Sequence, residues 1–62
     1  NIEKRVLIVI KEKKLLSKAL LEQKKLHNSG IISILEMNPC INNDQAKHIM
    51  EENKCTQIKW ID

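Results

Sequence analysis

Residues 34–46 constrain the fold more than any other stretch of this 62-residue chain. They hold its only proline, Pro39, and its strongest helix-start signal, Asn42. Asn38 precedes the proline, which disfavours helical backbone at that residue, so a helix before it must end there. Gln45 follows Asn42 at the spacing of a capping box, which predicts a new helix beginning at Asn42.

We expect that helix to run to about residue 53. Ala46, Ile49 and Met50 recur at the spacing of one helix face, which predicts that they are buried. Beyond it, Thr56 is a candidate cap for a last short helix that carries Ile58, Trp60 and Ile61.

The first 28 residues predict one long basic helix. Residues 2–27 contain neither glycine nor proline, and from Lys11 onward they are strong helix formers. Gly30 supplies the left-handed position that ends many helices. A wide apolar stripe would cover one side of this helix, while Leu7, Ile10 and Leu21 would lie on its far side.

An apolar ring at residues 6–10 makes this first helix a candidate for self-association, because a chain of this size can hardly cover one helical turn on all sides. The alternative is packing against the rest of a larger protein, of which this chain would be a fragment. The predicted oligomer interface consists of Ile2, Val6, Val9, Ile10, Leu16 and Leu20.

The expected fold is therefore all-α and a single small domain. The long helix of residues 1–28 would lead into a bundle of two or three short helices over residues 31–62. The alternative is β-α-β-α-β, with strands at Val6–Ile10, Ile31–Leu35 and Gln57–Ile61, which resembles the anticodon-binding domain of class II aminoacyl-tRNA synthetases. Residues 11–14 argue against it, because they offer no turn chemistry between a strand and a helix.

In the helical interpretation, residues 34–61 resemble the ubiquitin-associated superfamily and, within it, the CUE domain. Residues 34–39 are similar to that family's Met-Phe-Pro segment, with Asn38 in place of the phenylalanine, and residues 41–53 follow in the register of its second helix. The resemblance implies a three-helix bundle that binds ubiquitin. The partner-binding residues that it implies are Met37, Pro39, Trp60 and Ile61.

The charge is unevenly distributed. Residues 1–28 hold eight Lys and Arg against three acidic residues, and residues 29–62 hold three against five. A basic first half suggests nucleic acid as an alternative partner, through phosphate contacts from Lys4, Arg5, Lys11, Lys14 and Lys18. Trp60 is the only aromatic residue, so the chain has no platform for stacking single-stranded bases.

Catalytic and metal sites are not expected. Cys40, His48 and Cys55 lack the paired close spacing of a zinc site, and no oxyanion-hole signature accompanies them. The sequence thus predicts a non-enzymatic protein-protein interaction module without cofactor, with itself, ubiquitin or another protein as partner. We also expect free thiols, no membrane span, and an intracellular location in the cytoplasm or nucleus.

Overall fold

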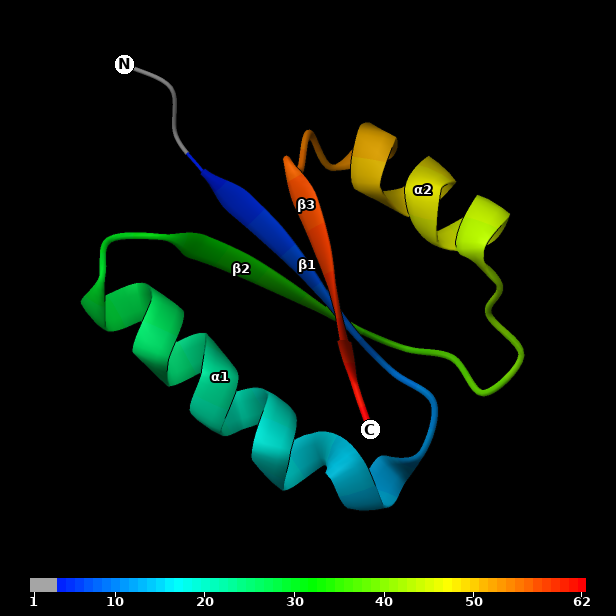
Figure 1. Cartoon of the computed structure of the whole chain (residues 1–62), viewed down its shortest axis with the longest axis horizontal. Coiled ribbons are helices and arrows are strands. Elements are labelled where there is room, and N and C mark those ends of the chain that lie inside the picture. Colours follow the sequence, from blue (N-terminus) through cyan, green and yellow to red (C-terminus); the bar gives the residue numbers. More distant parts are fainter. Residues whose placement is uncertain (1–3) are drawn as a thin grey trace.

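The computed structural model describes residues 4–62, which form a three-stranded parallel sheet with one helix on each face (Figure 1). The chain runs through β1 (Arg5–Ile10), a 3-10 turn η1 (Lys13–Leu15), α1 (Leu16–Asn28), β2 (Ile32–Met37), α2 (Asn43–Glu52) and β3 (Gln57–Ile61). The prediction of an all-α fold is therefore wrong, and the β-α-β-α-β alternative is the observed architecture.

The first strand lies in the middle of the sheet, whose order is β2-β1-β3. The connection through α1 moves to one side of β1, and the connection through α2 crosses back over it to the other side. Crossovers of the same hand that run in opposite directions place their helices on opposite faces. The central strand is consequently covered on both faces and on both edges.

The core consists of two clusters, one under each helix. Leu7 and Val9 point to the α2 face and pack with Ile41, Ala46 and Cys55. On the α1 face the buried residues are Val6, Ile8, Ile10 and Ala19. Successive side chains of a strand point to opposite faces, so one apolar run supplies both clusters.

The ring that we predicted on a helix at residues 6–10 is this central strand. Each of these five side chains is at most 2% exposed. A strand buried on both faces shows a continuous apolar run instead of alternation, which is why its period resembled a fully covered helical turn. Its composition of Val and Ile favours a strand.

The remaining helix predictions in these regions are wrong as well. The long helix of residues 1–28 is divided, because Glu12 is extended and α1 begins only at Leu16. The segment from Ile31 to Met37 forms β2 and not a short helix, and the segment capped by Thr56 forms β3. Residues 31–62 are therefore not a helical bundle, which removes the architecture on which the likeness to CUE domains depended.

Three local predictions are confirmed. Helix α2 begins after a complete capping box, in which the Asn42 side chain accepts from the Gln45 amide at 2.8 Å and the Gln45 side chain accepts from the Asn42 amide at 3.1 Å. Gly30 ends α1 with a φ of +79°, in the left-handed region. On α2, Ala46 is buried, and Ile49 and Met50 pack against the core as predicted.

Candidate binding site at the carboxyl edge of the sheet

The three parallel strands end at one edge of the sheet, at Ile10, Met37 and Ile61. Between β1 and β3 the strand order reverses: the connection that leaves β1 runs through α1 on one face, and the connection that enters β3 runs through α2 on the other. Open α/β sheets bind their ligands in the crevice outside the carboxyl ends of strands at such a switch point. A ligand site is therefore expected at this edge.

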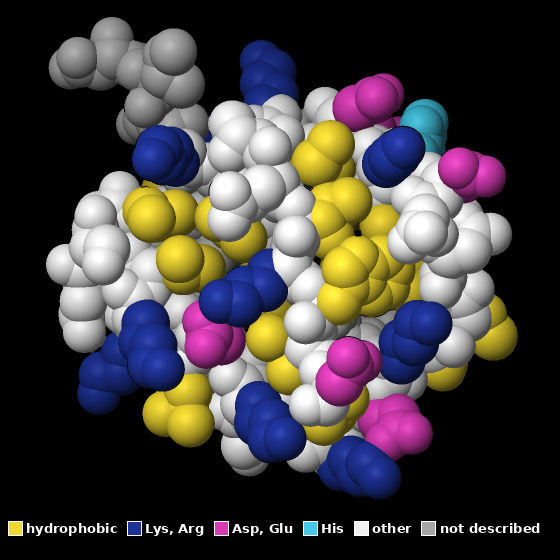
Figure 2. Space-filling model, in the orientation of Figure 1, with side chains coloured by type: hydrophobic (Ala, Val, Ile, Leu, Met, Phe, Trp, Pro, Cys, Tyr) yellow, Lys and Arg dark blue, Asp and Glu magenta, His cyan; other side chains and the backbone are white. Residues whose placement is uncertain are grey.

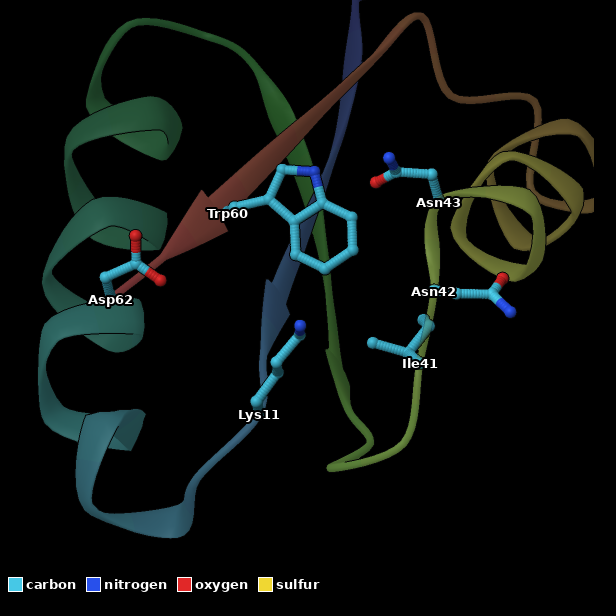
Figure 3. A pocket seen from close by; sticks show the side chains of 6 residues that line it. All are labelled: Lys11, Ile41, Asn42, Asn43, Trp60 and Asp62. Carbon is cyan, nitrogen blue, oxygen red and sulfur yellow. The ribbon is translucent and has the colours of Figure 1, made fainter.

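A hollow of about 490 Å³ opens at this point, on the α2 face. Figure 3 shows the indole of Trp60 reaching from β3 toward the segment that leads into α2, with Lys11 below it. The lining residues are Lys11, Ile41, Asn42, Asn43, Trp60 and Asp62. In Figure 2, hydrophobic side chains lie at the surface in the central part of the view, between the two helices.

The ring of Trp60 has a charged neighbour. The Lys11 ammonium lies 5.5 Å from the ring centroid, within the range of a cation-π contact. Trp60 remains 37% exposed. Asn42, Asn43 and Asp62 surround it with polar groups, so the hollow consists of an aromatic centre with a polar rim.

A second hollow of about 310 Å³ adjoins the first and shares Lys11 and Asp62 with it. Its other lining residues, which include Leu15 and Ile61, belong to the α1 side of the sheet. The Lys18 ammonium donates to the Asp62 main-chain oxygen at 3.3 Å across this side. Both hollows therefore lie where β1 and β3 end.

The predicted partner-binding residues meet at this edge, but they do not form one surface. Met37 and Ile61 belong to the strand positions that face α1, and β1 lies between them, with Ile10 as their common neighbour in the register. Trp60 points to the α2 face, and Pro39 is exposed in the loop after β2. Their role in binding stays a prediction.

The residues of the predicted oligomer interface do not form one surface in the structure. Val6, Val9 and Ile10 lie in the core, Leu16 is half-buried against it, and Leu20 is 51% exposed. The remaining member of that set, Ile2, lies outside the described residues. Burial in the sheet removes the reason for which self-association was predicted, and self-association itself stays a prediction.

The predicted nucleic-acid contacts are also separated. Lys4 and Arg5 lie at the amino end of β1, and the Arg5 guanidinium donates to the Asn53 carbonyl at 3.2 Å. Lys11, Lys14 and Lys18 lie at the carboxyl end, about 20 Å away along a six-residue strand. Only the second group belongs to the candidate site.

Sequence reasoning missed four lining residues of the larger hollow as site residues, namely Ile41, Asn42, Asn43 and Asp62, and gave Asn42 only the role of a helix cap. The α/β alternative contained the signal that finds them, because it places residue 11, the start of α2 and residue 62 at the carboxyl ends of strands. The helical interpretation assigned the same residues to unrelated helices.

Some charged groups outside the hollow have structural partners. The Lys59 ammonium donates to the Glu22 carboxylate at 2.8 Å, which ties β3 to α1 and lowers the pKa of Glu22. Cys40 is an exposed free thiol, and burial raises the pKa of the free thiol of Cys55. Within residues 4–62, no group of His, Cys, Asp or Glu side chains is arranged to hold a metal ion. No helix in this described part is long and apolar enough to cross a membrane.

No family model and no solved structure match the chain. Curated proteins do. The chain is 48% identical over 59 residues to the "ATP phosphoribosyltransferase regulatory subunit" of Prochlorococcus marinus subsp. pastoris, covering 95% of this chain and 15% of that protein. It is 43% identical over 58 residues to the protein of the same name in strain NATL1A, covering 94% and 15%. The chain thus spans about 15% of the length of these relatives.

These relatives overturn the likeness to ubiquitin-associated domains, because they match nearly the whole chain and none carries such a name. They are bacterial, so the nuclear part of the predicted location has no support. Along nearly its whole length, the chain is similar to a segment of ATP phosphoribosyltransferase regulatory subunits.

Proposed function

We propose that this chain is a non-catalytic binding module within a regulatory subunit of ATP phosphoribosyltransferase. The observation that carries the proposal is the 48% identity, over 95% of the chain, to a protein of that name. A regulatory subunit acts through contact with another protein, so the task of this module is protein-protein binding.

The hollow around Trp60 is the contact site that we assign to this function. Tryptophan is enriched among the few residues that dominate the binding energy of an interface. Here Lys11 contacts the ring, and polar groups line the hollow around it. An apolar anchor within a polar rim is the usual anatomy of a protein interface.

The test uses the complete protein that carries this chain together with the ATP phosphoribosyltransferase of the same organism. Sedimentation measures the complex, and the enzyme's rate is recorded with and without the protein. We expect Trp60→Ala to weaken the complex by about 30-fold, which corresponds to a hot-spot loss of about 2 kcal/mol. Lys47→Ala, at an exposed position of α2 outside the hollow, serves as the matched control.

The possible results separate the function from the site. If the wild-type protein neither binds the enzyme nor changes its rate, the proposed function is wrong. If the complex forms and Trp60→Ala binds as tightly as Lys47→Ala, the function stands and the contact lies elsewhere. Circular dichroism of both variants establishes that a lost complex does not reflect unfolding.

A further inference from the structure

Two neighbouring leucines stand on the solvent side of α1. Leu20 is 51% exposed and Leu21 is 63% exposed. The helix already packs a separate face against the sheet, where Ala19 is buried and Leu16 and Leu26 are partly buried. Helix α2, which lies wholly within the described residues 4–62, has no large apolar side chain that is exposed to this degree. Leu20 and Leu21 therefore lie outside the face of α1 that packs against the sheet.

Leu20 and Leu21 point about 100° apart on the helix, and Ser17 and Lys24 lie between them on its surface. Ser17 precedes them and Lys24 follows them at spacings of three and four residues, which are the positions that adjoin on a helix surface. Ser17 is exposed and small, so it leaves the leucine side chains open on the N-terminal side. We call Ser17, Leu20 and Leu21 the leucine shelf.

Lysines surround the shelf, and the nearby acidic groups do not neutralise them all. The lysines of this surface are Lys13, Lys14, Lys18, Lys24 and Lys25. Glu12 pairs with Lys14 at 3.1 Å, while Glu22 lies 2.8 Å from Lys59 and 3.9 Å from Lys25. Among the described residues, Lys24 has no carboxylate partner. Figure 2 shows dark-blue side chains along the lower left, where α1 runs.

The opposite face of the molecule lacks this excess of lysines, because α2 carries three acidic residues against one lysine, Lys47. Helix α2 exposes Asp44, Glu51 and Glu52, and because the two helices cover opposite faces, the charge difference between the halves of the chain becomes a difference between two sides. A positively charged surface attracts an acidic partner and repels a second copy presenting the same surface.

We propose that the leucine shelf and its lysines dock an acidic amphipathic helix of a partner protein, whose apolar face covers Leu20 and Leu21. A membrane-bound helix needs a wide apolar face, and α1 already uses its wide face against the sheet. Nucleic acid would engage the lysines and leave the leucines in water. This contact goes beyond the proposed function, because it lies on the α1 side of the molecule while the Trp60 hollow lies on the α2 side.

The experiment measures binding of a fluorescent helical peptide that carries leucines along one face and glutamates beside them. A matched peptide has lysine in place of each glutamate. The proteins compared are the wild type, the double variant Leu20→Ser/Leu21→Ser, and Lys47→Ala as a control on α2. The two leucines are exposed, so the double variant should fold, and Leu21→Ser alone provides a milder second variant. Vesicles of phosphatidylcholine and phosphatidylglycerol, and duplex RNA, are titrated in parallel.

We expect the acidic peptide to bind the wild type and Lys47→Ala equally, with an affinity that falls as salt is raised. The double variant should bind at least about tenfold more weakly, because the apolar anchors are lost. Absence of binding by the acidic peptide, or equal binding by the double variant, would overturn the proposal. Stronger leucine-dependent binding to vesicles, or stronger binding to RNA, would also overturn it. No ATP phosphoribosyltransferase is present, so failure here is distinct from failure of the proposed function.

Discussion

Replacing Leu7 with alanine tests the central feature of the fold, which is the burial of β1 on both faces. Leu7 is 0% exposed and lies in the cluster under α2. Truncation of an enclosed leucine removes its burial energy and leaves a cavity, at a cost of about 2–5 kcal/mol. A chain of 62 residues has a total stability of roughly 3–9 kcal/mol. The variant should therefore lose a large part of its stability, and its melting temperature should fall by about 10 °C or more.

Thermal and urea unfolding, followed by far-ultraviolet circular dichroism, measure this loss. Leu21→Ala is the matched control, since Leu21 is 63% exposed and its truncation should change the free energy of unfolding by less than about 0.5 kcal/mol. A helix through residues 2–27 would place Leu7 and Leu21 together on its far side. Equal, small effects of the two substitutions would therefore refute the buried strand.

Two further predictions concern titratable groups. The Lys59 hydrogen bond lowers the pKa of Glu22, so its contribution to the stability of the folded protein is present at neutral pH and is lost as the pH falls through that lowered pKa. In Lys59→Met, the pKa of Glu22, measured by an NMR titration of its carboxyl group, should move back toward its ordinary value. An unchanged titration curve would contradict the ion pair. Burial raises the pKa of the Cys55 thiol, so iodoacetamide at pH 8 should label the exposed Cys40 before it labels Cys55. Mass spectrometry measures the two labelling rates, and equal rates would show that Cys55 is accessible.

Local chemistry made parts of this fold predictable. The capping box of α2 joins residues three apart, and the left-handed turn after α1 needs only Gly30, so both are encoded within a few residues. The same holds for the buried face of α2, whose spacing identifies Ala46, Ile49 and Met50. Signals of this kind do not depend on which other elements pack nearby.

The charge imbalance shows what the tertiary structure adds to a feature of the sequence. The sequence alone determines that the first half is basic and the second half acidic. Because α1 and α2 cover opposite faces of the sheet, the basic residues lie mainly on the α1 side, with the exposed leucines, and the acidic residues lie mainly on the α2 side. A description of either partner surface therefore requires the topology.

The strands and the hollow were decided by tertiary structure. By periodicity alone, an apolar run such as Val6–Ile10 fits both a covered helical turn and a doubly buried strand, and the choice depends on β2, β3 and the two helices that surround it. Lys11 and Trp60 are 49 positions apart in the sequence, and parallel pairing brings them together at one edge. What the sequence by itself determined were the caps, turns and charges, because those act between near neighbours. The sheet and its site follow from contacts between distant segments, which no local pattern encodes.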